Sequence, residues 1–374
     1  MLDERFEYSE LYAAKDRMKR GRASGMDGIP IECVLGVRGV EGHDAANLVS
    51  PLDGILLDLF NHILVLGVFP DAWRRAALVP LLKAGSLNAR DPNNYRGIAL
   101  LNTISKLFCN MVENRLTNFQ KACKLIADEQ FGFTDGRMAL DGIFILDTLI
   151  DSTLAQGGNL YVAFIDFQKA YDFVSRDGMF YKMIRMHMGS RILRVVHNMY
   201  TSVESVVQLG VSYSDVLRQL VGLRQGCILS PSLFSLYISD LPKFLEARKG
   251  NERCEGVKLG EGQVVRVLMY ADDLALVASS AEDLQRMLEA LHDYAAKWHL
   301  IVNTMKTKAM VFNRCYTGRR SKEVAETQRI NLREKYMFKY NGNTIDTVSE
   351  FKYLGTVFHE DVICTFNKVR QVAT

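Results

Sequence analysis

The sequence predicts an α+β protein in which a compact βαββαβ unit follows a largely helical N-terminal region. Residues 160–167 are apolar at every position except Asp166, as in a strand buried on both faces. Two more apolar segments, 264–270 and 274–279, flank an Ala-Asp-Asp turn and are expected to form a hairpin. Residues 281–298 then carry apolar side chains at helical spacing, and 308–312 supply a closing strand.

The region before this unit contains three helical patterns separated by turn signals. Glycine and proline in RASGMDGIP break a charged N-terminal helix and begin a loop-rich stretch. Helices are expected at about 53–66, 102–116 and 139–152, and residues 77–82 are a strand candidate. The polar residues 153–159 mark the expected boundary with the βαββαβ unit.

Two further segments are expected between the first strand of the unit and its hairpin. Helices occupy about 177–204, and a polar hairpin spans about 205–221. Ser230 as N-cap and Pro231 in the first turn begin the next helix, and Ser280 caps the helix at 281–298.

Composition narrows the class of protein. The 374 residues carry a net charge of +3, and no low-complexity tract is present. The first thirty residues are charged and no apolar run reaches the roughly 18 residues of a bilayer span, which predicts an intracellular protein, nuclear or cytoplasmic, that is neither secreted nor in a membrane. Seven scattered cysteines without a C-x-x-C spacing disfavour a disulfide framework and a structural zinc site.

A local basic segment contrasts with the nearly neutral total. Residues 314–340 contain eight Lys or Arg and three Glu, a net charge of 8 − 3 = +5. A contact with nucleic-acid phosphates and a solvated linker explain this segment equally well.

Three carboxylates fall at the ends of apolar strands. Asp166 ends the first strand, and Asp272 and Asp273 lie at the hairpin turn. If their strands are adjacent, the carboxylates repel one another unless a cation lies between them. Oxygen ligands of this kind suit Mg²⁺, and two such ions support phosphoryl or nucleotidyl transfer. Each aspartate alone also fits ordinary turn chemistry, but uncompensated charge beside apolar strands is costly.

Eight segments in one order resemble the reverse transcriptases of non-LTR (LINE-like) retrotransposons. The segment KRGRASGMDGIP resembles the family's N-terminal motif. The segments NYRGIALLNTISKLFCNMVENRL and EQFGFTDGR resemble its first and second fingers motifs. Five later segments resemble the family's palm motifs: FIDFQKAYD, GLRQGCILSPSLF, YADD, NTMKTK and FKYLG. The tetrapeptide YADD alone would be weak support, whereas the ordered set is specific.

The resemblance implies a right-hand polymerase fold. It places a fingers subdomain at 1–156, a palm subdomain at 157–345, and a primer-grip hairpin with a truncated start of the thumb at 346–374. The thumb is therefore expected to be largely absent, and the chain is expected to be a fragment of a longer polyprotein or a decayed copy of one.

The resemblance also implies roles for individual residues. Catalytic roles fall to Asp166, Asp272, Asp273 and Lys306, and metal binding to the three aspartates with the backbone of Phe167. Nucleotide-binding roles fall to Lys83, Arg96, Tyr171, Gln225 and Gly226, and primer or template contacts to Tyr270, Phe351, Lys352, Tyr353, Leu354 and Gly355.

Several of these assignments have competitors. Lys308 lies close to Lys306 in the sequence, Tyr171 also fits a core aromatic, and Arg96 fits a solvated surface charge. The chain departs from the family pattern at four places. Gly97 and Ile228 stand where the family usually has proline, and His299 stands where it has glycine. The family also has a basic residue at about the position where Thr134 and Asp135 stand in this chain.

The expected reaction is RNA-directed DNA synthesis from dNTPs on an RNA template and DNA primer, with two Mg²⁺ ions or Mn²⁺ as the alternative, and no protein partner is inferred. A catalytically inactive nucleic-acid-binding remnant is the alternative function. An RNA-dependent RNA polymerase is a third hypothesis, which Ala271 and Tyr171 disfavour.

Overall fold

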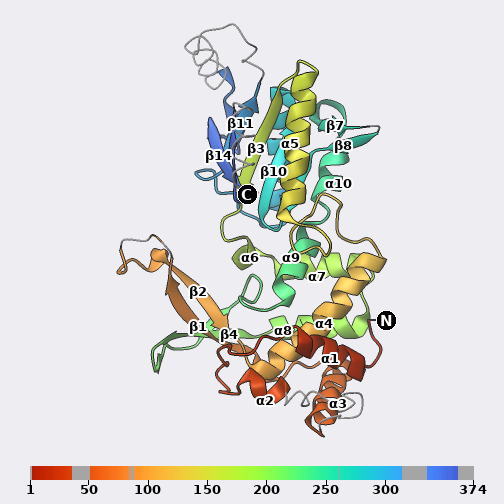
Figure 1. The fold of residues 1–374 in the computed structure, drawn as a ribbon, viewed down its shortest axis with the longest axis vertical. Helices are drawn as coiled ribbons and strands as arrows, with labels where there is room; N and C mark the ends of the chain where they lie inside the picture. The colour runs from red at the N-terminus through yellow and green to blue at the C-terminus, as the bar shows by residue number, and fades with distance from the viewer. Residues whose placement is uncertain are drawn as a thin grey trace, which may run out of the picture. The chain divides into compact units, whose positions relative to one another are not determined.

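A computed structural model describes residues 2–35, 51–83, 85, 88–260, 262–313 and 335–360. The chain divides into two compact units. The first unit contains Met1–Leu125 and Val174–Leu236, and the second contains Ile126–Phe173 and Tyr237–Thr374. Figure 1 shows both units and labels many of their helices and strands. Each unit is built from two separate stretches of sequence.

Within the described part of the second unit, six strands form one sheet in the order β12-β13-β11-β3-β10-β9. The central strand β3 pairs antiparallel with β10 on one side and β11 on the other. The order β11-β3-β10-β9, with α11 (Ala281–Lys297) between β10 and β11 in the chain, confirms the predicted βαββαβ unit. The strands are β3 (Leu160–Asp166), β9 (Val267–Tyr270), β10 (Asp273–Ala278), β11 (Lys308–Phe312), β12 (Phe338–Tyr340) and β13 (Asn343–Thr347).

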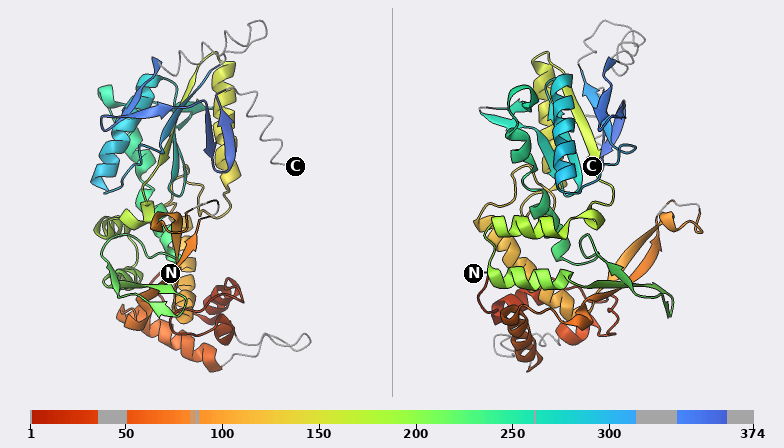
Figure 2. Two further views of the ribbon diagram at one scale, coloured as in Figure 1. Left: turned by 90° about the vertical axis from the view of Figure 1, so that its left-hand side faces the viewer. Right: turned by 180° about the vertical axis from the view of Figure 1, so that it is seen from behind.

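Helices cover both faces of this sheet, with α5 (Ala139–Ala155) and α11 on opposite sides (Figure 2). The other elements are α6 (Ala170–Phe173), α10 (Leu241–Glu246), β7 (Val257–Leu259), β8 (Gln263–Val265), β14 (Glu350–Tyr353), β15 (Thr356–His359) and the short 3-10 turn Gly250–Glu252. Ser280 accepts a hydrogen bond from the Asp283 backbone N–H at the start of α11, which confirms the predicted cap.

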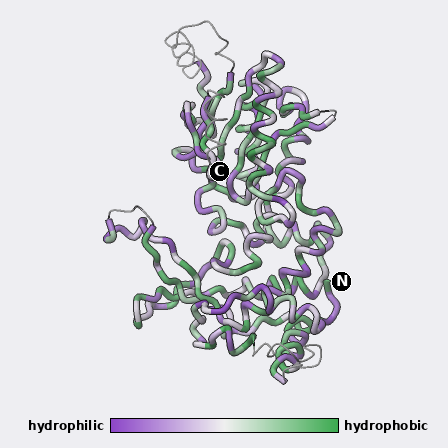
Figure 3. The backbone as a smooth tube through the Cα atoms, in the orientation of Figure 1, coloured by the Kyte–Doolittle hydropathy of each residue, from purple (hydrophilic) through white to green (hydrophobic). Residues whose placement is uncertain are grey.

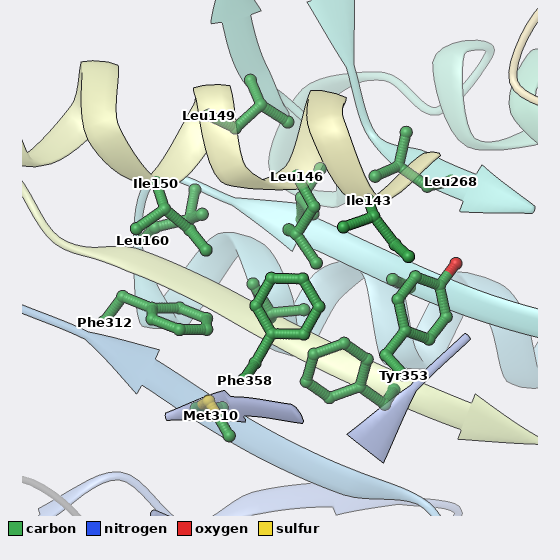
Figure 4. Packing of buried hydrophobic residues seen from close by; sticks show 14 of the residues in the cluster. Ile143, Leu146, Leu149, Ile150, Leu160, Leu268, Met310, Phe312, Tyr353 and Phe358 are labelled. Carbon is green, nitrogen blue, oxygen red and sulfur yellow. The ribbon is translucent and has the colours of Figure 1, made fainter. Parts of the chain in front are cut away.

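The core beneath α5 explains why β3 is apolar at every position. Leu160, Val162 and Phe164 alternate along β3 and belong to one buried cluster with α5 residues such as Leu146. Figure 4 shows Leu160 and Leu146 in this cluster. The intervening β3 residues, among them Ala163, are also buried. Because successive side chains of a strand point to opposite faces, a strand covered on both sides must be apolar throughout.

The first unit combines helices with a smaller sheet. Within its described residues, β2, β1, β4 and β5 are neighbours in that order, and β6 also pairs with β4. Its strands are β1 (Arg75–Leu82), β2 (Tyr95–Leu100), β4 (Val203–Leu209), β5 (Ser212–Tyr213) and β6 (Leu217–Gln219). Its helices are α1 (Tyr8–Asp16), α2 (Ile31–Leu35), α3 (Pro51–Leu66), α4 (Thr103–Ala122), α7 (Arg176–Arg185) and α8 (Ser190–Tyr200), with 3-10 turns at Asp71–Trp73 and Pro92–Asn94. The chain passes into the second unit within α9 (Leu229–Ile238).

The helices and hairpin predicted over 177–221 are present as α7, α8 and the strands β4 to β6, and they lie in the first unit, where β4 pairs in parallel with β1. The prediction that Ser230 is an N-cap is wrong. The helix begins at Leu229, and the Ser230 hydroxyl donates to the backbone oxygen of Arg224 at 2.7 Å.

The boundaries of the compact units do not follow the predicted subdomain limits. Helix α5 packs on β3, so residues on either side of the 153–159 segment share one core. The fingers and palm division therefore stays a prediction. Residues 314–334 of the basic segment lie outside the described residues.

Two expected absences can be checked within the described part of the chain. No helix there is both long enough and apolar enough to cross a membrane. Figure 3 shows hydrophobic and hydrophilic residues intermixed along the chain. The five cysteines in the described ranges, Cys33, Cys109, Cys123, Cys227 and Cys254, are free thiols.

Truncating a core side chain of α5 tests the packing of the second unit. Leu146 is 0% exposed, so we expect Leu146→Ala to lower the free energy of unfolding by about 2–5 kcal/mol through lost burial and a residual cavity. Leu140→Ala on the same helix is the control, because Leu140 is 63% exposed, and should cost less than about 0.5 kcal/mol. Urea denaturation measures both, and equal losses would contradict this packing.

Candidate active site

The antiparallel register of the second unit places two predicted metal ligands side by side. Asp273 at the start of β10 is the direct partner of Asp166 at the end of β3. Directly opposite residues in such a pair have Cβ atoms about 4.5–5.5 Å apart. Asp272 precedes Asp273 in the β9–β10 turn, so three carboxylates gather at one edge of the sheet.

The environment of Asp272 and Asp273 resists the ionisation of their carboxyl groups. Burial, with the neighbouring charges of Asp272 and Asp166, raises the pKa of Asp273 to about 6. The pKa of Asp272 is also raised, by burial first and then by Asp166. Desolvation and like charge both destabilise the anionic form, and a cation bound here would relieve both.

The donor set suits a hard cation, because every side-chain ligand is a carboxylate oxygen. The described residues contain no group of three or more Asp, Glu, His or Cys side chains arranged to hold a metal ion. The carboxylates are therefore neighbours by register rather than a formed coordination shell. Metal binding at Asp166, Asp272 and Asp273 stays a prediction.

The backbone of Phe167 is held beside this edge. Phe167 forms an isolated antiparallel bridge with Val302, and its two hydrogen bonds run from Gln168 N to Ile301 O at 2.7 Å and from Asn303 N to Asp166 O at 2.8 Å. These two hydrogen bonds involve neither the N–H nor the carbonyl of Phe167. The bridge is therefore compatible with the predicted role of the Phe167 backbone in metal binding.

Two lysines that the sequence does not separate have different environments. The Lys306 Nζ lies 3.8 Å from Asp166 Oδ2 and is well exposed. The Lys308 Nζ lies 2.5 Å from Asp346 Oδ2, the partner of Lys308 in the β11–β13 register. The geometry therefore favours Lys306 over Lys308 for a role beside the carboxylates.

Tyr171 in α6 lies in the electrostatic field of the site. Burial raises the pKa of the Tyr171 hydroxyl, and the charge of Asp272 raises it further. The structure thus brings the predicted sugar-discriminating side chain near one of the predicted metal ligands. Tyr270, at the end of β9, is partly buried against the core beneath α5.

A cavity of about 540 Å³ joins Asp166 and Asp273 to the predicted primer grip. Strands β14 and β15 form a hairpin whose turn residues Leu354 and Gly355 both have positive φ, 47° and 87°. Phe351 stacks on Phe164 of β3 with ring centroids 4.5 Å apart and planes 10° from parallel. The lining includes Asp166, Asp273, both Lys306 and Lys308, and the hairpin residues Phe351, Lys352, Tyr353 and Leu354.

The predicted nucleotide-binding residues outside this unit form a second group in the first unit. Gln225 Nε2 donates a hydrogen bond to the Gly97 carbonyl, next to Arg96 on β2. Gly226 has φ 75°, and a Cβ there would lie 2.8 Å from the Ala99 carbonyl oxygen, so glycine is required. Gln225 and Gly226 are therefore docked on the strand that carries Arg96.

Lys83 lies at the end of the β1–β2 pair, where its backbone N–H donates to Asn94 O at 2.8 Å. Arg96 is the β2 partner of Leu81, two residues before Lys83. The structure thus places both basic residues on one hairpin.

A buried arginine that sequence reasoning missed supports the Gln225 loop. Arg224 is 2% exposed, and its Nη2 donates to Trp73 O at 2.7 Å. Its backbone oxygen accepts from Ser230 Oγ, and its backbone N–H donates to Tyr200 Oη at 3.4 Å. Its place directly before Gln225 in GLRQGC is the signal that could have identified it.

Sequence reasoning also missed two residues that hold the carboxylate edge. Thr307 Oγ1 accepts a hydrogen bond from the backbone N–H of Asp166 at 3.2 Å. Gln130 Oε1 accepts from the backbone N–H of Ala271 at 2.9 Å. Gln130 lies in the EQFGFTDGR motif, which was assigned as a motif without roles for its members.

Comparison with known proteins defines the class. A family model described as "Reverse transcriptase (RNA-dependent DNA polymerase)" matches residues 82–358. Since this match covers more than half of the sequence, the chain belongs to the reverse transcriptase family.

The relatives define the family more narrowly than the family model does. By sequence similarity, this chain is a homologue of the RNA-directed DNA polymerases of non-LTR retrotransposons. The probable RNA-directed DNA polymerase from transposon BS of Drosophila melanogaster is 29% identical over 298 residues, which are 77% of this chain and 31% of that protein. The transposon TX1 uncharacterized 149 kDa protein of Xenopus laevis is 30% identical over 81% of this chain and 22% of its own length. The chain spans about a third or less of these relatives.

Among solved structures, apo telomerase from Candida tropicalis matches with a TM-score of 0.48 and 13% identity, covering 79% of this chain and 48% of that one. The mixed α and β architecture is consistent with the right-hand polymerase fold that the family membership implies.

Replacing Asp273 by asparagine tests the electrostatics of the edge. A pKa near 6 in the folded state lies above the roughly 3.9 of a free aspartate, so the folded state binds more protons between about pH 4 and pH 6. This carboxyl's contribution to the free energy of unfolding therefore falls as pH rises through that window. In metal-free buffer, the stability gain from Asp273→Asn should grow from pH 4 to pH 7.

Urea denaturation at several pH values measures that gain. Asp215→Asn is the matched control, because Asp215 is an exposed aspartate in the other unit. If Asp273→Asn raises the free energy of unfolding by the same amount at all pH values, the carboxylates at this edge do not repel one another as expected.

Proposed function

We propose that this chain is the polymerase core of a non-LTR retrotransposon protein that extends a DNA primer on an RNA template with dNTPs. One observation carries the proposal. Asp166 and Asp273 are direct partners across β3 and β10, and they line the same cavity as Lys306 and the β14–β15 hairpin. The family membership supports the same reaction.

Asp166, Asp272 and Asp273, with the backbone of Phe167, would hold two Mg²⁺ ions, with Mn²⁺ as the alternative. Such ions supply activation of the attacking hydroxyl and stabilisation of the leaving oxygen in phosphoryl transfer. The chain contributes a rigid edge that fixes the carboxylates, because β3 is buried from Leu160 to Ile165 and β10 from Leu274 to Ala278.

The remaining residues act through their own chemistry. Lys306 would donate a proton to the leaving pyrophosphate, because its ammonium lies 3.8 Å from Asp166 Oδ2. Tyr171 would exclude a ribose 2′-hydroxyl by its bulk. Arg96 and Lys83 would bind the triphosphate, for which a guanidinium fork and an ammonium are suited.

Two further groups would bind nucleic acid. Gln225 and Gly226 would lie against the template and the nascent base pair, where a glycine permits close approach. The hairpin residues Phe351, Lys352, Tyr353, Leu354 and Gly355, with Tyr270, would hold the primer end. We assign fingers to 1–156, palm to 157–345 and primer grip to 346–374, and place the reaction inside the cell, in the nucleus or cytoplasm.

Primer extension on an RNA template tests the reaction. The wild-type chain should incorporate dNTPs in preference to rNTPs when Mg²⁺ is present, and Asp272→Asn should reduce incorporation to background because it removes one carboxylate ligand. Asp215→Asn, at an exposed position in the first unit, should behave as wild type. Binding of RNA without incorporation under any metal would instead support a non-catalytic remnant, and preference for rNTPs would support an RNA polymerase.

The two lysines give a matched pair for the proton-transfer role. General acid catalysis contributes roughly 10²–10⁴-fold, so Lys306→Ala should lower kcat by about 10² or more and shift its pH profile. Lys308→Ala should cause a smaller loss, because the Lys308 ammonium pairs with Asp346. Single-turnover incorporation at several pH values measures both, and a larger loss for Lys308→Ala would reverse the assignment.

A further inference from the structure

The turn that presents Asp272 and Asp273 has an unfavourable backbone conformation. Strands β9 and β10 pair through Tyr270 and Asp273, so Ala271 and Asp272 form a two-residue loop. Ala271 has φ 56°, in the left-handed region where a side chain is disfavoured and glycine is usual. Strain of this kind persists only when surrounding contacts enforce it.

The segment Glu129–Gly132 supplies those contacts. Gln130 forms a parallel bridge with Met269, the β9 residue two positions before Ala271. The Met269 N–H donates to Glu129 O, and the Phe131 N–H donates to Met269 O, both at 2.8 Å. This short segment therefore acts as an additional strand along the edge of β9 that leads into the turn.

Gln130 makes the contact with the strained residue itself. Its Oε1 accepts hydrogen bonds from the backbone N–H groups of Ala271 at 2.9 Å and Gly132 at 2.8 Å. The Gln130 side chain is 0% exposed, so water is excluded as a competing acceptor. Losing this oxygen would leave two buried N–H groups unpaired, which is costly.

The close approach of the two segments requires glycine at position 132. A Cβ at Gly132 would lie 2.3 Å from the Ala271 nitrogen and 2.8 Å from the Tyr270 carbonyl carbon, both backbone atoms that cannot move aside. In the Gln-Phe-Gly sequence, Gln130 thus supplies the hydrogen-bond acceptor for the turn, and Gly132 lets the backbone approach it closely.

An arginine at the other end of the motif orders the same segment. Arg137 Nη1 donates to Asp128 O at 2.6 Å and to Gln130 O at 3.1 Å. Its Nη2 pairs with Asp128 Oδ1 at 2.7 Å. Arg137 therefore holds the backbone from which the Gln130 side chain reaches Ala271.

We propose that Gln130 is a positioning residue for polymerisation: its Oε1 fixes the Ala271 N–H and so holds the turn that orients Asp272 and Asp273. The role rests on the proposed function, because positioning matters only if these carboxylates take part in catalysis. Gln130 itself touches no reacting atom. Its loss acts through the backbone conformation of the residue before Asp272.

Two variants at this position separate the hydrogen bond from packing. Gln130→Leu keeps a side chain of similar size without the acceptor, whereas Gln130→Glu retains an oxygen acceptor. Gln156→Leu is the control, because it makes the same change at an exposed glutamine beyond α5 in the same unit.

Hydrogen exchange of the Ala271 amide is the first readout and needs no enzymatic activity. We expect Gln130→Leu to accelerate that exchange by about tenfold or more, while amides of α11 keep wild-type protection. Gln130→Glu should retain most of the protection, and Gln156→Leu all of it. Unchanged exchange at Ala271 in Gln130→Leu, equal loss in the Leu and Glu variants, or loss of protection throughout the second unit would each overturn the proposal.

Polymerase kinetics are the second readout. Gln130→Leu should lower kcat by about tenfold or more with little change in KM for dNTP, since the turn and not the nucleotide contacts is altered. A rise in KM with unchanged kcat would overturn the positioning role. If the wild-type chain does not polymerise, the proposed function fails, and the exchange comparison still decides whether Gln130 holds the turn.

Discussion

The candidate site depends on one constraint, the register that places Asp273 opposite Asp166. Like charges directly opposite each other on a sheet are destabilising, and burial raises the pKa of Asp273 further. The arrangement persists because the strands that carry the carboxylates are fixed elsewhere: β3 and β10 pair over six positions and are buried between helices. The apolar core thus stabilises a polar edge that is unfavourable by itself, as expected where a charged ligand is to be bound.

Much of this arrangement could be predicted from local sequence. The unbroken apolar run of β3 indicated burial on both faces, and the alternation of Leu160, Val162 and Phe164 toward the α5 core shows why. The paired aspartates between two apolar strands identified the hairpin turn. These predictions succeeded because each depended on residues adjacent in the chain, where period and turn chemistry act directly.

The remaining features could not be predicted, because they depend on contacts between distant residues. The pairing of β4 with β1 moved residues 174–236 into the first unit, and no local pattern encodes that partner. Lys306 and Lys308 look alike in the sequence, and only the pairing of β11 with β13 gives Lys308 its partner Asp346. Likewise, the role of Gln130 depends on a hydrogen bond from the Ala271 N–H to its Oε1, and the two residues are 141 positions apart in the sequence.

Aromatic packing joins the predicted primer-grip hairpin to the strand that carries Asp166. Phe351 stacks on Phe164, two residues before Asp166 on β3, so one strand carries both the carboxylate and the ring against which the hairpin packs. Burial, and then the charge of Asp273, raise the pKa of the Tyr353 hydroxyl above its usual value. The hairpin position is therefore set by aromatic packing on the core, and a shift of β3 would move the carboxylate and the predicted primer-binding residues together.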